Sequence, residues 1–321
     1  MHIHVLGDLE VVVDGQQVDL GGAKPRTLVG LLVAAGGRAV AVEQLIEEIW
    51  DGAPPARVEA SLQTYVARLR RALGTGRTDR IRTHAGGYSL RQDDAEVDAR
   101  LFAAEVAAAR AEADPRAAVV ALTAALARWR GEAYAGLPSA GLRAEAVRLG
   151  ELRMAATEDL WQLRTDLGDH AEAVGTLERL VAEHPLRERL WALLARAQYL
   201  AARQGDALAT LRRAREHLSE ELGVDPGPEL QALEQAILRQ DPALAPARPA
   251  PAPTVPPATP PAADAPGIFG RDTALATAEE LLAAVASTGR GRVLVVEGES
   301  GIGKSRLADE VAERARRRGL H

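Results

Sequence analysis

Residues 58–73 read VEASLQTYVARLRRAL, and this stretch decides the fold of the N-terminal part of the 321-residue chain. Its apolar side chains recur at helical spacing and form one stripe, made of Leu62, Val66, Leu69 and Leu73. The residues off this stripe include Arg57, Gln63, Thr64, Arg68 and Arg71. We therefore predict a helix, starting near Ala56, that packs its apolar side on a core and leaves a basic side free to contact a partner.

A glycine-containing hairpin is predicted directly after this helix. Two short strands, Arg80–Arg82 and Tyr88–Leu90, are joined by residues 83–87, which end in two glycines. A hairpin in this position, behind a helix with a basic exposed side, is interpreted as a wing.

The residues before the helix predict a small sheet and two further helices. Short strands are expected over Ile3–Val13, broken at Gly7, and over Gln17–Leu20 after an Asp-Gly turn. Apolar residues then recur at helical spacing from Lys24, and a second helix is expected over Val42–Trp50. A sheet, three helices and a hairpin in this order predict a winged helix-turn-helix over residues 1–95.

The net charge of −6 argues against a nucleic-acid partner, but the charges are unevenly distributed. From Arg57 to Arg91 there are eight arginines and only two acids, Glu59 and Asp79, a local balance of +6. Scattered arginines are usually the solvated face of a helix. Here the excess of positive charge is confined to the helix and the hairpin. This favours binding of double-stranded DNA with the helix in the major groove.

The rest of the chain predicts a helical domain, a linker and a third segment. Residues 96–240 read as successive helices, and Ala173–Leu177 resembles Ala207–Leu211 at an offset of 34 residues, the tetratricopeptide period. Residues 241–266 hold ten of the 18 prolines and predict an extended linker. The expected fold class is mainly α and multidomain, and we expect the winged helix and the helical domain to have their own cores.

Residues 267–321 contain a phosphate-binding loop. Its pattern is carried by Gly298, Gly301, Gly303, Lys304 and Ser305, between an expected strand over Arg292–Glu297 and an expected helix over Lys304–Arg318. Backbone amides of such a loop bind phosphate, and the Ser hydroxyl ligates Mg²⁺. Hydrolysis also needs an acidic residue on a second strand, and 16 residues follow Ser305. We therefore expect a truncated P-loop α/β segment, possible ATP and Mg²⁺ binding only in a longer form, and no enzyme activity.

Other features exclude several classes of function. The chain has no Cys, its seven His have no metal-ligand spacing, and no nucleophile–base arrangement is apparent. The apolar stretch Leu28–Ala35 is too short to cross a bilayer, and the N-terminus lacks a secretory pattern. We expect a cytoplasmic protein without a metal site, a catalytic site or a required cofactor.

Several motifs together resemble the Streptomyces antibiotic regulatory proteins, the SARP family, over essentially the whole chain. They are Leu6–Glu10, Leu20–Leu28, Leu62–Leu73, Trp129–Gly131 and Glu221–Leu230. The resemblance implies an OmpR-type winged helix over residues 1–95 and a bacterial transcriptional activation domain of tetratricopeptide-like repeats over residues 96–240. It also implies that residues 267–321 begin a signalling NTPase domain.

The resemblance also implies roles for single residues. The groove-facing positions of the third helix correspond to Ala60, Gln63, Thr64 and Arg68, and the minor-groove position of the wing corresponds to His84. Phosphate contacts are expected from Arg70, Arg71 and Arg82, and Arg57 is expected at the DNA as well. Residues 51–55 are where such regulators touch RNA polymerase, at its sigma or alpha subunit.

The leading hypothesis is a transcription activator that recruits RNA polymerase at promoters of a secondary-metabolite gene cluster, binding direct repeats as a side-by-side homodimer. One alternative is an ATP-switched regulator whose NTPase domain is cut off here. Another is a tetratricopeptide scaffold for protein binding, which the local balance of +6 disfavours.

Overall fold

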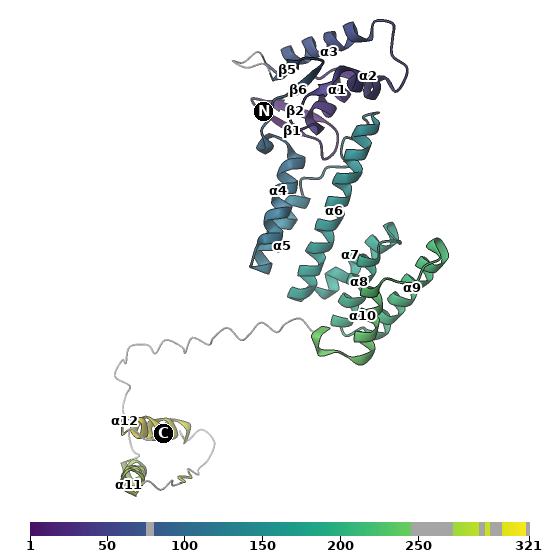
Figure 1. Cartoon of the computed structure of the whole chain (residues 1–321). Coiled ribbons are helices and arrows are strands. Elements are labelled where there is room, and N and C mark those ends of the chain that lie inside the picture. The colour runs from purple at the N-terminus through teal and green to yellow at the C-terminus, as the bar shows by residue number, and fades with distance from the viewer. Residues whose placement is uncertain (75–79, 245–271, 289–292, 296–303, 319–321) are drawn as a thin grey trace. The chain divides into compact units, whose positions relative to one another are not determined.

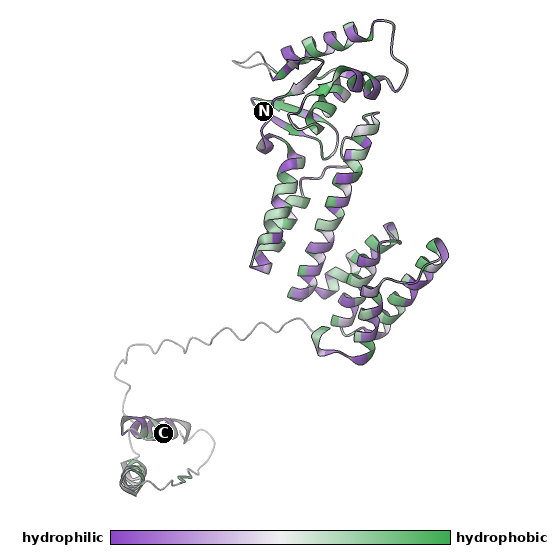
Figure 2. Cartoon of the chain, in the orientation of Figure 1, coloured by the Kyte–Doolittle hydropathy of each residue, from purple (hydrophilic) through white to green (hydrophobic). Residues whose placement is uncertain are grey.

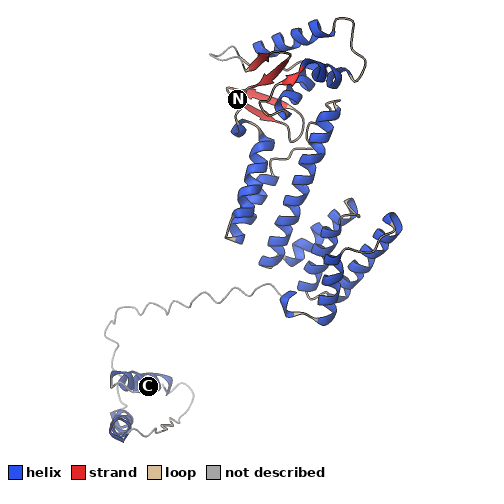
Figure 3. Ribbon diagram, viewed as in Figure 1, coloured by secondary structure: helices blue, strands red, loops and turns tan. Residues whose placement is uncertain are grey.

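The computed structural model describes residues 1–74, 80–244, 272–288, 293–295 and 304–318, most of which are helical (Figure 3). The chain divides into two compact units, Met1–Pro249 and Ala250–His321, and each is described by itself. The mainly α, multidomain fold class is confirmed.

A three-stranded antiparallel sheet opens the first unit. Its strands are β1 (His2–His4), β2 (Glu10–Val13) and β3 (Gln16–Gln17), in the order β1-β2-β3. The β2–β3 turn has φ of 50° at Asp14 and 79° at Gly15, the left-handed conformation that an Asp-Gly pair accommodates. The turn lies where the sequence predicts it, whereas β3 is shorter than predicted.

Three helices follow the sheet, α1 (Ala23–Ala34), α2 (Val42–Trp50) and α3 (Val58–Ala72). The bounds of α2 are those predicted. Helix α3 starts later than expected because Arg57 has φ −122° and ψ 49° and occupies the N-cap. The predicted apolar stripe is confirmed, since all four of its residues are buried: Leu62, Val66, Leu69 and Leu73.

The wing is a second three-stranded antiparallel sheet, made of β4 (Val40–Ala41), β5 (Ile81–His84) and β6 (Gly87–Leu90) in the order β4-β6-β5. A tight turn through Gly86, with φ 81°, joins β5 to β6. A Cβ on Gly87 would lie 2.4 Å from the carbonyl oxygen of Val40, so this position requires glycine. The predicted hairpin is confirmed, and β4 is an addition to it.

Seven α-helices of the described chain follow the wing within the first unit: α4 (Asp98–Ala111), α5 (Pro115–Leu126), α6 (Ala140–Leu167), α7 (His170–Glu183), α8 (Glu188–Leu200), α9 (Gln204–Leu222) and α10 (Pro228–Arg239). Single 3-10 turns lie at Asp94–Glu96 and Pro242–Leu244. The 34-residue offset places Ala173 in α7 and Ala207 in α9, and both are fully buried. Each of these helices packs on α8, as expected for stacked helical repeats.

The core of the winged helix continues beyond residue 95. One core joins Ile3 and Leu28 to Phe102 of α4 and Leu142 of α6, and a second core begins at Trp161 and serves α7–α10. In Figure 1, α4 and α6 lead away from the winged helix. The expectation of separate cores is therefore wrong, because helices α4–α6 complete the core of the winged helix rather than starting a new one.

A buried carboxylate joins α4 to the segment after β1. Asp98, which is 5% exposed, accepts hydrogen bonds from the backbone amides of Val5 at 2.8 Å and Leu6 at 3.3 Å. The side chains of Arg130 and His4 lie 3.6 Å from the same carboxylate. The guanidinium of Arg130 supplies the charge that a buried carboxylate needs.

Backbone hydrogen bonds join the same segment to the loop before α6. The amides of Arg130, Tyr134 and Ala135 donate to the carbonyls of Leu6, Val5 and Gly7 at 2.8, 2.8 and 3.2 Å. Gly7 has φ 154°, and a Cβ there would lie 3.2 Å from the Cβ of Arg130. The motifs at residues 6–10 and 129–131 therefore contact each other in the folded chain.

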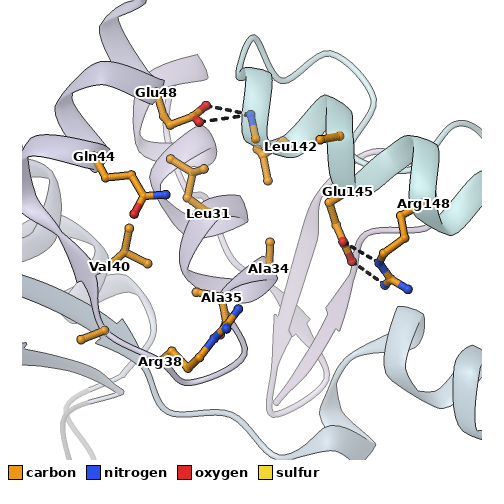
Figure 4. Close-up of a pocket in the computed structure, with 13 residues that line it drawn as sticks. Leu31, Ala34, Ala35, Arg38, Val40, Gln44, Glu48, Leu142, Glu145 and Arg148 are labelled. Atoms are coloured by element: carbon orange, nitrogen blue, oxygen red, sulfur yellow. Dashed lines mark hydrogen bonds and ion pairs between the residues drawn. The ribbon is translucent and has the colours of Figure 1, made fainter.

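A second contact joins α2 to the N-terminus of α6. The carboxylate of Glu48 accepts hydrogen bonds from the hydroxyl of Ser139 at 2.6 Å and the amide of Gly141 at 2.9 Å. In Figure 4 the dashed lines from Glu48 lead to the backbone beside Leu142. A carboxylate here compensates the unpaired amides and the positive end of the helix dipole. Beside it lies an open pocket of about 600 Å³, with Leu31 and Leu142 among its apolar lining residues.

In the second unit the described helices are α11 (Asp272–Thr288) and α12 (Lys304–Arg317). They are joined by ion pairs from Arg314, at 2.9 Å, and Arg318 to Glu279. Helix α12 covers all but the last residue of the helix predicted over Lys304–Arg318.

The expected strand over Arg292–Glu297 is not formed in its described part, Val293–Val295. The side chain of Val293 is 87% exposed, and no neighbouring strand is present among the described residues of this unit. A parallel strand needs a partner for its hydrogen bonds, so an isolated apolar run stays irregular. The loop glycines Gly298, Gly301 and Gly303 lie outside the described residues.

The shared core predicts that residues 1–95 do not fold alone. Removing α4–α6 would expose several large apolar side chains, each worth about 1.5–3 kcal/mol when buried, against a total stability of about 5–15 kcal/mol. We expect fragment 1–95 to lack a cooperative thermal transition in circular dichroism, whereas fragment 1–249 melts cooperatively. Equal cooperative transitions in both fragments would contradict the shared core.

Candidate nucleic-acid interface

Helix α3 presents a polar side away from the core. The four predicted groove-facing residues, Ala60, Gln63, Thr64 and Arg68, are all exposed. Their spacing of three or four residues places them on one side of the helix, opposite the buried stripe. Figure 2 shows hydrophilic and hydrophobic residues alternating along α3. An exposed helix side of this kind fits the width of the DNA major groove.

The N-terminal end of α3 is open to solvent. Residues 51–57 are exposed, and the loop turns sharply at Asp51 and Gly52, with φ of 49° and 74°. Arg57 stands at the N-cap of α3. The free amides and the dipole of a helix N-terminus attract anions, so Arg57 adds its charge where a phosphate would be favoured.

The guanidinium of Arg68 is held by a loop far away in sequence. Its Nη2 lies 3.3 Å from the Oδ2 of Asp19, in the segment between β3 and α1. The side chain of Arg68 is 49% exposed and that of Asp19 is 83% exposed. Sequence reasoning missed Asp19, since nothing in a local pattern links two residues 49 positions apart.

Two neighbouring arginines of α3 differ in their surroundings. Arg70 is half-buried and donates from Nε to the carbonyl of Ile81 at 3.0 Å and from Nη2 to the hydroxyl of Thr83 at 2.7 Å. It therefore fixes β5 of the wing to α3. Arg71 is exposed, and its Nε lies 3.4 Å from the carbonyl of Ala67 on its own helix. Arg71 keeps its guanidinium at the surface.

The wing carries the remaining predicted residues. Arg82 and His84 lie on β5 and are both exposed. The Nε2 of His84 lies 2.8 Å from the hydroxyl of the buried Ser89 on β6, so one ring nitrogen is engaged across the hairpin. The wing thus presents one guanidinium and one imidazole near its tip.

Aromatic contacts fix α3 against α2. The rings of Trp50 and Tyr65 stack with centroids 6.0 Å apart and an interplanar angle of 14°. The ammonium of Lys24 lies 5.1 Å from the centre of the Trp50 ring, a cation–π distance. These contacts add to the buried stripe in holding α3 in place, and sequence reasoning had assigned none of the three residues to the interface.

The base of the wing is anchored by Glu96. Its carboxylate lies 3.1 Å from Nη1 of Arg80 and 3.0 Å from the amide of Asp93, which donates to it. Burial works against the charged form, but the Asp93 amide and the Arg80 guanidinium outweigh it and hold the pKa of Glu96 below its ordinary value. The carboxylate therefore stays charged at neutral pH and keeps Arg80 in place.

Metal-binding clusters and membrane-spanning helices are both absent from the described residues. No group of three His, Asp or Glu side chains there could hold a metal ion. No helix in the same residues has the length and hydrophobicity needed to span a membrane. Lys304 and Ser305 of the phosphate loop begin α12.

The fold and this surface together define a transcription regulator with an N-terminal winged helix. Comparison with protein families supports that class. The model "Transcriptional regulatory protein, C terminal" matches residues 15–90, "Bacterial transcriptional activator domain" matches residues 97–238, and "AAA ATPase domain" matches residues 267–321.

Similar proteins narrow the class to one family. The chain is 38% identical to the regulatory protein AfsR of Streptomyces coelicolor over 97% of its own length but only 32% of the length of AfsR. It is also 38% identical to the transcriptional regulator RedD of the same organism, over 76% of this chain and 72% of RedD. The chain belongs to the Streptomyces antibiotic regulatory protein family, and both of these relatives are named as regulators.

A solved structure agrees with this assignment. Mycobacterium tuberculosis EmbR, in complex with a low-affinity phosphopeptide, matches with a TM-score of 0.71 and 36% identity over 75% of this chain and 65% of that one. The order of a winged helix followed by a helical activator domain is therefore found in an experimental structure at substantial sequence identity.

The contrast between Arg71 and Arg70 yields a prediction. Replacing Arg71 by Ala should reduce the slope of log binding constant against log salt by about one, since one phosphate contact contributes about 0.9. Arg70→Ala, which removes the neighbouring arginine of the same helix, is the matched comparison. This variant should in addition lower the melting temperature of the protein, because the contact of Arg70 with β5 is lost. Titrations of a random-sequence duplex at several salt concentrations measure the slopes. An unchanged slope for Arg71→Ala would place Arg71 off the DNA.

Proposed function

We propose that the chain binds specific sites in double-stranded promoter DNA, with α3 in the major groove and the wing at the minor groove. The observation that carries this proposal is the exposed side of α3, which holds Gln63, Thr64 and Arg68 opposite a fully buried stripe. A side-chain amide, a hydroxyl and a guanidinium are the groups that hydrogen-bond to base edges. Ala60, on the same side, offers a methyl group for an apolar contact with thymine.

Phosphate contacts would position the helix in the groove. We assign them to the exposed Arg57, Arg71 and Arg82, with Arg70 acting mainly through the wing that it holds. His84 is assigned to the minor groove, where its exposed ring stands near the tip of the hairpin. Positive charge at this surface offsets the overall charge of −6.

We further propose that the chain activates promoters of a secondary-metabolite gene cluster by recruiting RNA polymerase, through its sigma or alpha subunit, to the exposed loop of residues 51–55. Support comes from the family and from the position of the loop. It directly follows α2, whose Glu48 is bound to the activator helices. A side-by-side homodimer on direct repeats, acting in the cytoplasm, completes the proposal.

A second candidate is a nucleotide-switched regulator, favoured by the AAA ATPase match over residues 267–321. In that case the DNA-binding surface would be the same, and ATP bound by the segment with Lys304 and Ser305 would control it.

The domain bounds proposed for the whole chain are residues 1–95, 96–240, 241–266 and 267–321. A protein-binding scaffold is the third candidate.

The base-reading role of Arg68 can be tested directly. A duplex selected by the wild-type chain from a random DNA library serves as operator. Arg68→Ala should weaken operator binding by about 1–3 kcal/mol and relax discrimination at one base pair, because an Arg guanidinium binds guanine in a bidentate manner. Anisotropy titrations with single-base variants of the operator measure this. Equal losses on operator and random DNA would make Arg68 a phosphate contact.

The role of residues 241–321 is tested separately. We expect the 321-residue chain to hydrolyse no ATP, because catalysis requires a sheet and an acidic residue beside the phosphate loop, and the described residues of the second unit form no sheet. Ending the chain at Gln240 should leave operator affinity unchanged, because both cores lie before it. ATP turnover that disappears in Lys304→Ala, or a large loss of affinity on truncation, would favour the nucleotide-switched candidate.

A further inference from the structure

Asp19, in the loop between β3 and α1, connects this loop to α3. One carboxylate oxygen, Oδ1, accepts a hydrogen bond from the backbone amide of Gly21 at 2.7 Å. The other, Oδ2, accepts one from Nη2 of Arg68 at 3.3 Å. The same side chain therefore fixes the shape of its own loop and contacts the guanidinium that the proposed function assigns to base reading.

The backbone of Gly21 also contacts this guanidinium. A Cβ at Gly21 would lie 2.8 Å from the Cζ of Arg68, 2.9 Å from Nη1 and 3.0 Å from Nη2. These similar distances mean that the flat guanidinium lies against the backbone of Gly21. Gly21 also has φ 86°, a conformation that favours glycine. Any other residue would push the guanidinium away from its position beside Asp19.

The stability of the protein does not account for this arrangement. Asp19 is 83% exposed and Arg68 is 49% exposed, and ion pairs at such positions contribute little to folding. An acidic residue beside a DNA-binding helix also repels phosphate. A reason for its presence is that it restricts the many rotamers of a long arginine side chain before DNA arrives.

We propose that Asp19, together with Gly21, is a positioning residue that holds the Arg68 guanidinium ready to bind a base edge. The inference rests on the proposed function of Arg68. The carboxylate occupies one of the five N–H donors of the guanidinium, so others remain for the base. Asp19 thereby favours base contact by Arg68 over a loose contact with the phosphate backbone.

The test uses the 321-residue chain and the duplex that it selects from a random library. Asp19→Asn removes the charge but keeps the size of the side chain. At the base pair where Arg68→Ala relaxes discrimination, Asp19→Asn should reduce discrimination by about 3- to 10-fold. This is the order expected for ordering one long side chain. Discrimination at the other base pairs should not change. In the Arg68→Ala background, Asp19→Asn should have no effect on discrimination.

Asp14→Asn is the matched control. Asp14 is exposed in the β2–β3 turn, and Asn accepts its φ of 50° equally well, so the variant removes the same charge without touching Arg68. If Asp19→Asn raises affinity equally for all sequences and leaves discrimination intact, Asp19 is only a repelling charge and the inference is wrong. If the wild-type chain selects no sequence at all, it is the proposed function that fails.

Discussion

The buried carboxylate of Asp98 is the interaction on which the first unit depends. It satisfies the amides of Val5 and Leu6 just after β1, and Arg130 balances its charge from the loop before α6. A buried amide without a partner costs about 1–3 kcal/mol, so losing these hydrogen bonds would be unfavourable. Asp98 thus joins α4, the segment after β1 and the loop before α6 at one point. The backbone groups of residues 5–7 therefore find these partners only when α4 and the loop of residues 129–135 are in place.

This constraint has consequences for activation. Helix α3, which we propose faces DNA, shares one core with α4–α6, and Glu48 adds a contact between α2 and the N-terminus of α6. A bound site in DNA would therefore fix the direction of α6 as well as that of α3. The basic surface of α3 and the wing is small, and the rest of the chain is acidic enough to give a net charge of −6. This distribution of charge favours binding of DNA at α3 and the wing over the rest of the surface, in agreement with the proposal.

Local patterns in the sequence were sufficient for the elements with a strong period. The stripe of α3, the bounds of α2, the wing and the repeat that places Ala173 and Ala207 in equivalent helices were all predictable. Strand β4 was not, because two residues carry no period. The apolar run at Val293–Val295 was misleading, because strand formation depends on a partner that local sequence does not reveal.

Contacts between distant residues account for the rest. The shared core joins Ile3 to Phe102, and the hydrogen bond from Arg68 to Asp19 joins residues 49 positions apart. The sequence identified the side of α3 that is exposed, since that follows from helical spacing. It could not identify Asp19 and Gly21, because the loop approaches α3 only in the folded chain.

Base reading by α3 can be tested by methylation interference on a duplex that the chain selects. Methylation of guanine N7 blocks the major-groove edge that an arginine of α3 would contact. We expect methylation of one or more guanines within the selected site to abolish binding, and methylation outside the site to have no effect. If binding tolerates N7 methylation at every guanine of the site, α3 does not read guanine in the major groove and the proposed role of Arg68 is wrong.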